Sequence, residues 1–141
     1  MAINFFAEDI KFPQIDRSVL KKWINNTIKS ENMQSGEINI IFSSDSYLLG
    51  INERYLNKKD FTDIITFDYC EDRIVAGDLF ISLTRVKENS EIFGTGYPNE
   101  LNRVIIHGIL HLLGYNDISE EEKKCMRQKE NEYLNSLNSN S

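Results

Sequence analysis

The apolar residues of this chain change their spacing several times along the sequence, and this limits the fold to layers of strands and helices. Runs rich in β-branched and other apolar residues predict four strands, over 3–7, 37–43, 63–69 and 74–82. Apolar stripes at helical spacing predict five helices, which follow Asp16, Ser44 and Asp45, Ser82, Asn99 and Ser119. This order predicts an α+β fold, with a small mixed sheet of about four strands packed with about five helices.

Turn and capping residues set the expected boundaries of these elements. The polar link 70–73 is short enough to join two strands as a hairpin. Gly77 inside the second of these strands indicates a bulge or a close backbone approach. Asn99 is expected to cap the next helix after a loop that contains glycine and proline. Ser119 and Glu122 have the spacing of a capping box for the last helix, which is expected to reach about residue 137.

Length and charge exclude several classes of protein. The 141 residues fit one domain, expected over 1–137 with 138–141 as a polar frayed tail. The formal net charge of −6 argues against binding nucleic acid by bulk charge, although a local basic patch stays open. The two cysteines, Cys70 and Cys125, suggest neither a disulfide framework nor a cysteine zinc site, and they fit a reducing cytosol. We expect neither a secretory leader nor a membrane span.

The two histidines of the sequence, His107 and His111, stand four residues apart within one predicted helix. Side chains at i and i+4 point from the same face of a helix, so the two imidazoles converge. Gly114 ends this helix, and the turn that follows brings Asp117 back toward the histidines. Zinc accepts imidazole and carboxylate ligands, and three ligands leave a fourth position for water, as in catalytic sites. These residues predict one zinc ion per chain, bound by a central helix and the turn after it.

The same residues also have structural interpretations. The helix is rich in apolar residues, and a buried histidine is often a hydrogen-bonded core residue rather than a ligand. Asp117 lies shortly before Ser119 and could serve only as a carboxylate at the N-terminus of the last helix. The histidine pair combined with the glycine turn and the aspartate favours the metal site. Nitrogen and oxygen ligands also bind nickel, cobalt and copper, so zinc is a preference among these metals.

The residue after the first histidine separates classes of zinc enzyme. Peptidases with an H-E-x-x-H helix place their general-base glutamate at this position, where this chain has Gly108. A peptidase of this kind is therefore disfavoured. Because glycine has no side chain, Gly108 is expected to leave open space beside the metal, where a phosphate could approach.

The segment H-G-I-L-H-L-L-G-Y at 107–115 closely resembles the signature H-G-x-L-H-L-x-G-Y-D-H of the YbeY family. Further segments that resemble the family follow in family order, namely Ile51-Asn52 with Tyr55, T-D-I-I-T-F at 62–67, and G-D-L at 77–79. The similarity spans Ile51 to about Met126 and implies a single YbeY-like domain.

The resemblance implies a cytoplasmic, zinc-dependent endoribonuclease that acts on single-stranded RNA. It implies a role in maturation of ribosomal RNA, especially at the 3′ end of the small-subunit RNA, and in ribosome quality control. The implied partners are ribosomal RNA and the small subunit or its precursors, without DNA. We expect zinc to lower the pKa of its bound water toward about 7, so that this water attacks an RNA phosphodiester. No residue is assigned as the general base.

The chain departs from the family pattern at two positions. Asp117 stands where the family has a third zinc histidine, so the implied ligands are His107, His111 and Asp117. Leu56 stands where the family has an arginine that is thought to engage the substrate. That role would fall to neighbours, and Lys58 and Lys59 are the candidates for substrate binding.

Two other functions stay open. One is a ribosome-associated assembly factor in which the metal is mainly structural, which the net charge of −6 and Leu56 both favour. The other is a zinc peptidase-like hydrolase whose general base comes from another part of the chain.

Overall fold

The structure is a computed structural model that describes residues 2–56 and 62–139. Its strands form one sheet in the order β1-β2-β4-β3. Their bounds are β1 Ile3–Ala7, β2 Gln34–Ser43, β3 Ile64–Asp68 and β4 Ile74–Ser82. β2 pairs in parallel with both β1 and β4, whereas β3 runs antiparallel to β4. The predicted α+β class, with a mixed four-stranded sheet and five helices, is confirmed.

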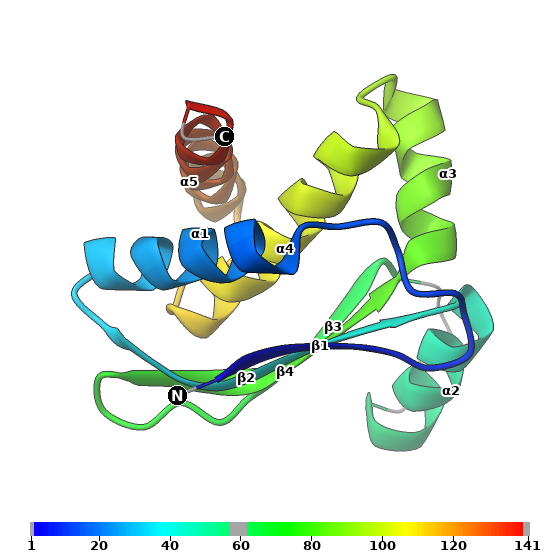
Figure 1. Ribbon diagram of the computed structural model, residues 1–141, viewed down its shortest axis with the longest axis horizontal. Helices are drawn as coiled ribbons and strands as arrows, with labels where there is room; N and C mark the ends of the chain where they lie inside the picture. Colours follow the sequence, from blue (N-terminus) through cyan, green and yellow to red (C-terminus); the bar gives the residue numbers. More distant parts are fainter. Residues whose placement is uncertain (1, 57–61, 140–141) are drawn as a thin grey trace.

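The helices lie on both faces of this sheet. Their bounds are α1 Arg17–Ser30, α2 Asp45–Leu56, α3 Leu83–Phe93, α4 Tyr97–Leu112 and α5 Glu120–Ser139. Figure 1 shows α1, α4 and α5 above one face of the sheet, with α2 near the edge on the other side. Ile40 and Leu79 of the sheet and Ile105 and Ile109 of α4 are fully buried in the main core. α4 is therefore held firmly against the sheet.

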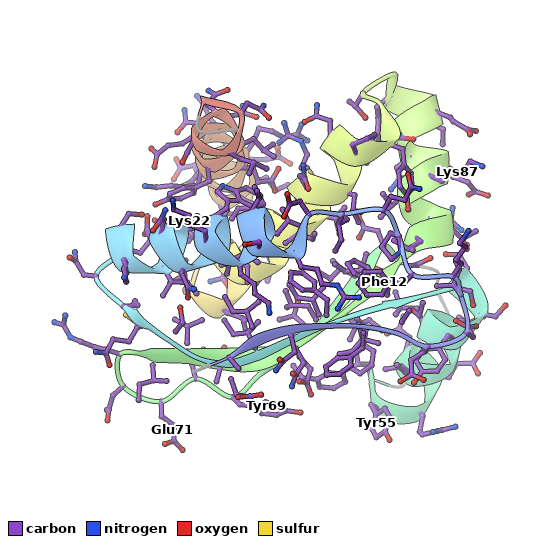
Figure 2. The ribbon with its side chains drawn as sticks, in the orientation of Figure 1. Phe12, Lys22, Tyr55, Tyr69, Glu71 and Lys87 are labelled. Carbon is purple, nitrogen blue, oxygen red and sulfur yellow. The ribbon has the colours of Figure 1, made fainter. Side chains whose placement is uncertain are left out.

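A smaller apolar cluster covers part of the opposite face. Leu48 and Ile51 of α2 pack with Ile65 of β3, and Phe67 and Phe80 border them. Figure 2 shows Phe12 between the sheet and the helices above it, whereas Tyr69 and Glu71 project from the other side. α2 thus packs against β3 and covers part of this face of the sheet.

Several predicted caps form as expected. The Asp16 side chain accepts a hydrogen bond of 3.1 Å from Val19 N at the start of α1. Ser119 and Glu122 form the reciprocal bonds of a capping box, with Ser119 N donating to Glu122 Oε1 (2.9 Å) and Glu122 N donating to Ser119 Oγ (3.1 Å). The link 70–73 joins β3 to β4 as the predicted hairpin.

Several boundaries differ from the prediction, and β3 is one residue shorter at each end than the predicted 63–69. Asn99 does not cap α4, because the helix begins at Tyr97 and Gly96 is its N-cap, with φ of 83° and no side-chain cap. Pro98 lies in the first turn, where its missing N–H costs nothing and its fixed φ suits a helix. β2 begins three residues before the predicted residue 37, and α5 continues through Ser139, beyond the predicted end at 137 and into the expected tail.

Gly77 allows α4 and β3 to approach β4 closely. A Cβ at this position would lie 2.4 Å from the carbonyl oxygen of Phe67 and 2.9 Å from Leu112 Cδ2. The close backbone approach that was one of the two expectations for Gly77 is therefore correct. The bulge lies opposite, in β2, where the pairing with β4 shifts between Ser35 and Ile38.

Candidate metal centre

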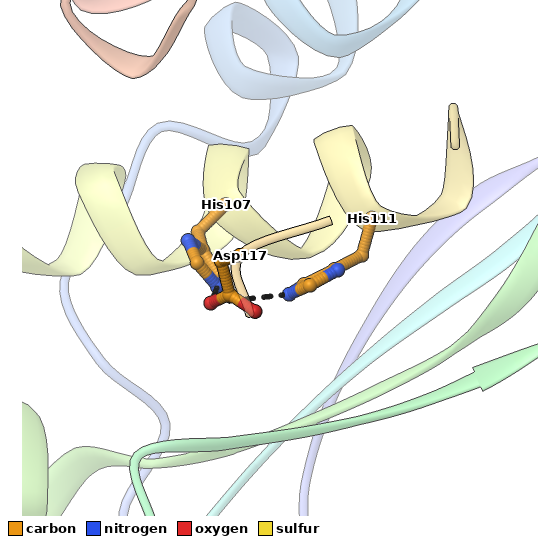
Figure 3. Close-up of side chains that lie close together, drawn as sticks. All are labelled: His107, His111 and Asp117. Carbon is orange, nitrogen blue, oxygen red and sulfur yellow. Dashed lines mark ion pairs between the residues drawn. The ribbon is translucent and has the colours of Figure 1, made fainter. Parts of the chain in front are cut away.

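The two histidines project from the C-terminal half of α4 toward the same point. Their ring centroids are 4.6 Å apart with an interplanar angle of 82°. Their Nε2 atoms both face the carboxylate of Asp117, at 3.3 Å from Oδ2 for His107 and 3.7 Å for His111, as drawn in Figure 3. One ligand atom from each of the three residues lies within 4.8 Å of the others, so this group could hold a metal ion. The structure thus brings all three predicted ligands together.

The turn between α4 and α5 carries Asp117 to this point. Gly114 has φ of 103°, a left-handed conformation that ends the helix and that glycine adopts without strain. Tyr115 OH then donates a 2.7 Å hydrogen bond to Glu31 Oε1 at the end of α1. Tyr133 of α5 donates to the other oxygen of Glu31, and Lys129 Nζ lies 3.4 Å from it. This contact with α1 anchors the turn two residues before Asp117.

Glu130 of α5 holds the other side of His107. Its Oε2 lies 2.6 Å from His107 Nδ1, and its Oε1 accepts a 2.7 Å bond from Arg103 of α4. An ionised carboxylate has no hydrogen to donate, so Nδ1 carries a proton, and in the neutral ring Nε2 then has the lone pair that a metal needs. Carboxylate–histidine pairs of this kind orient metal ligands in many proteins.

The sequence interpretation missed Glu130, although a signal for it exists. The inner face of α5 carries an apolar stripe of Met126, Tyr133, Leu134 and Leu137, all buried. Glu130 lies on this stripe at helical spacing and is only 5% exposed. A carboxylate on a buried stripe needs a partner, and histidines or arginines elsewhere in the chain are the natural candidates.

The electrostatics of the site separate the two histidines. Burial by itself lowers the pKa of His107, but the hydrogen bond to Glu130 and the charges of Glu130, Asp117 and Asp63 outweigh it, so this pKa is raised. Burial and the neighbouring His107 lower the pKa of His111. Burial opposes ionisation of Glu130, yet its bonds from His107 and Arg103 keep its pKa below the ordinary value. His111 is therefore the more readily available neutral imidazole.

These side chains open into a cleft of about 650 Å³. Besides the three candidate ligands, its walls are formed by α2, β3 and the residues that precede β3, namely Asn52, Leu56, Thr62, Asp63, Ile64, Ile65, Thr66 and Asp68. Burial raises the pKa of Asp63, which the positive charge of His107 partly offsets. The candidate metal centre thus faces a cleft with a mixed polar and apolar wall, which is large enough to admit a substrate.

The expectation for Gly108 is wrong. Its Cα faces the sheet rather than the cleft, because a Cβ there would lie 2.7 Å from Ile64 Cδ1 and 3.0 Å from Leu79 Cδ1. Gly108 is buried, and its lack of a side chain lets α4 pack close to β3 and β4. The residue after His107 therefore serves helix–sheet packing and leaves no room for a phosphate.

The predicted substrate-binding residues are only partly placed. Leu56, in the position of the family arginine, lines the cleft and is 43% exposed. Lys58 and Lys59 lie outside the described residues. Their candidacy for substrate binding stays a prediction.

With this geometry in place, comparison with known proteins identifies the family. A sequence profile described as Endoribonuclease YbeY matches residues 2–138. The chain belongs to the YbeY family. Membership confirms the enzyme class that the sequence predicted, a hydrolase acting on RNA.

Curated relatives agree with this YbeY assignment. The chain is 46% identical over 134 residues to the endoribonuclease YbeY of Bacteroides thetaiotaomicron, covering 95% of this chain and 98% of the relative. It is 45% identical over 139 residues to that of Azobacteroides pseudotrichonymphae, covering 99% and 100%. The solution structure of TM1509 from Thermotoga maritima is similar, with a TM-score of 0.69 and 26% identity, covering 96% of this chain and 89% of that one. None of the helices in residues 2–56 and 62–139 has the length and apolar character that a membrane crossing requires.

Proposed function

We propose that this protein is a zinc-dependent endoribonuclease that cuts single-stranded RNA during ribosomal RNA maturation. The observation that carries the proposal is the convergence of two imidazole Nε2 atoms and one carboxylate oxygen at the wall of an open cleft. The names of the relatives, which are endoribonucleases, support RNA as the substrate. Action at the 3′ end of the small-subunit RNA, a part in ribosome quality control and a cytoplasmic location follow from the family resemblance.

The donor set suits zinc. His107, His111 and Asp117 offer two nitrogens and one oxygen, which is fewer than the four protein ligands of a structural zinc site. Glu130 fixes the tautomer of His107 that leaves Nε2 free to bind. When bound, zinc supplies Lewis acidity and a water that ionises near neutral pH.

The residues of the chain itself define how the substrate is held. Glu130 forms ion pairs with both Arg103 and His107, so neither Arg103 nor Glu130 offers an unpaired charge to the cleft. The polar side chains Asn52, Thr62 and Thr66 line the cleft beside the candidate ligands. These uncharged groups can hydrogen-bond phosphate or sugar oxygens, which positions a strand without reading its sequence.

Cleavage of a labelled RNA tests this function. The wild-type protein is expected to cut a single-stranded RNA with the sequence of the small-subunit 3′ end, and to leave the matching duplex intact. His111→Ala is expected to abolish cleavage, because it removes one of three ligands, whereas the exposed Glu121→Ala is a matched control that keeps it.

Two results would contradict the proposal. Cleavage that survives both His111→Ala and a chelator would show that the metal centre does not cut RNA. A zinc-loaded wild type that leaves RNA intact but binds small subunits would support the assembly-factor alternative instead.

A further inference from the structure

A second cavity, of about 210 Å³, adjoins the cleft on the other side of the His107 ring. His107 and Asp63 line both spaces. The Nε2 side of the ring faces Asp117 in the cleft, and the Nδ1 side faces Glu130, which lines the second cavity. A polymer bound across the candidate metal centre would therefore reach this cavity with its next unit.

One wall of the cavity is an aromatic ring that is not packed in the hydrophobic core. Phe93, the last residue of α3, is 67% exposed although it lines this space. It makes no ring contact with another aromatic side chain in the described part of the chain. An exposed aromatic ring next to a cleavage site is a stacking surface for an unpaired base, since every base has a π-face.

Among the residues that the structure describes, this cavity offers one cation that can meet a ligand, although the carboxylates of Asp63, Glu100 and Glu130 line it as well. The carboxylates of Glu100 and Glu130 are 7% and 5% exposed, and they accept hydrogen bonds from Thr95 and from Arg103 and His107. Arg127 is exposed, and it forms no ion pair with any residue that the structure describes. Its guanidinium is therefore free to contact a phosphate.

We propose that this cavity is a nucleotide subsite, in which a base next to the cut phosphate stacks on Phe93 while Arg127 contacts the RNA backbone. The assignment rests on the proposed ribonuclease function. The subsite gives the enzyme a place to bind unpaired RNA. This place is separate from Leu56, which stands in the position of the family arginine. Because a base in a duplex is already stacked and paired, this contact also explains a preference for single strands.

Steady-state cleavage of a single-stranded RNA tests the stacking contact. Phe93→Ala is expected to raise KM by about 5- to 20-fold with kcat within about twofold of wild type. Phe93→Tyr keeps the ring and is expected to retain the wild-type KM. Ile92→Ala is the matched control, because Ile92 is a neighbouring apolar residue of α3, 72% exposed, that does not line the cavity.

The salt dependence of KM tests the backbone contact. Arg127→Gln is expected to reduce the slope of log KM against log salt concentration by about 0.7, the value for one phosphate contact to a single strand. Lys124→Gln removes an exposed cation from the same helix outside the cavity, and it should leave the slope unchanged.

A fluorescent base separates the subsite from the proposed function. RNA that carries 2-aminopurine should lose fluorescence on binding to the full-length, metal-stripped protein, and Phe93→Ala should abolish this quenching while Ile92→Ala keeps it. Equal KM values and equal quenching for Phe93→Ala and Ile92→Ala, in a wild type that does cut RNA, would overturn the subsite and leave the proposed function standing. A zinc-loaded wild type that cuts no RNA would instead overturn the proposed function.

Discussion

Replacing Glu130 with glutamine tests how the fold prepares His107 for a metal. The amide has nearly the shape of the carboxylate, so the packing of α5 on α4 is preserved. It loses the negative charge, and only one of its two ends can accept a hydrogen bond. The contacts at 2.6 Å to His107 and 2.7 Å to Arg103 therefore cannot both survive as charge-assisted bonds.

The size of the effect follows from these two contacts. Loss of a carboxylate that orients a metal-binding histidine weakens metal binding by about 10- to 100-fold. This corresponds to about 1.4–2.7 kcal/mol of binding free energy. The protein without metal should also lose stability, by about 1–3 kcal/mol, because Arg103 keeps a charge with no carboxylate beside it. The 22% exposure of the Arg103 side chain places this loss toward the lower end.

Competitive titration of zinc against a chromophoric chelator measures the first effect, and thermal unfolding measures the second. Glu132→Gln is the matched control on the same helix, because the side chain of Glu132 is 58% exposed and its ion partner is Lys129 rather than a residue of the metal centre. If Glu130→Gln binds zinc as tightly as Glu132→Gln does, Glu130 does not prepare His107 and the reasoning is refuted.

Three further outcomes are expected. Gly77→Ala should cost about 2–3 kcal/mol and lower Tm by roughly 6–12 °C in calorimetry, because its Cβ would meet the backbone oxygen of Phe67 at 2.4 Å; an unchanged Tm would show that the contact is relaxed easily. Burial opposes ionisation of Glu31, but its bonds from tyrosines and Lys129 keep its pKa below the ordinary 4.5. The ionised Glu31 therefore stabilises the fold fully above pH 4.5, and this stabilisation is lost as the pH falls through the lowered pKa. Glu31→Gln should be less stable than wild type at pH 7 by about 1–3 kcal/mol in urea unfolding. A difference in unfolding free energy that did not shrink below pH 4 would contradict this. Burial raises the pKa of the Cys70 thiol to about 11. Iodoacetamide treatment followed by peptide mass analysis should therefore find the exposed Cys125 modified first. Preferential labelling of Cys70 would contradict the packing around its thiol.

The sequence predicted those elements whose apolar periodicity is strong. β1 and β4 match their expected ranges, and the caps at Asp16 and Ser119 form through the side chains that were expected to make them. The start of β2 was missed because Gln34–Gly36 has no apolar pattern, and this segment is a strand only through pairing with β4 across a bulge. The start of α4 was missed because Gly96 acts as a cap through its backbone, without a side chain to signal it.

The residues of the metal centre were likewise predicted only in part. The spacing of His107 and His111 and the glycine turn before Asp117 are local features, and the sequence was enough to bring these three residues together. The contacts of Glu130 and Gly108 depend on how α5 and the sheet pack on α4, which no local pattern states. Gly108 was therefore assigned to the cleft when its Cα in fact faces Ile64 and Leu79.

The most direct test of the central claim is a metal analysis of the purified protein and of its His107→Ala and Asp117→Ala variants, with RNA cleavage measured on the same preparations. We expect one zinc ion per wild-type chain, loss of zinc and of cleavage together in each variant, and circular dichroism that shows both variants folded. A wild type that cuts RNA without bound metal, or an Asp117→Ala variant that keeps both its zinc and its activity, would contradict the claim that these three residues form the catalytic metal centre.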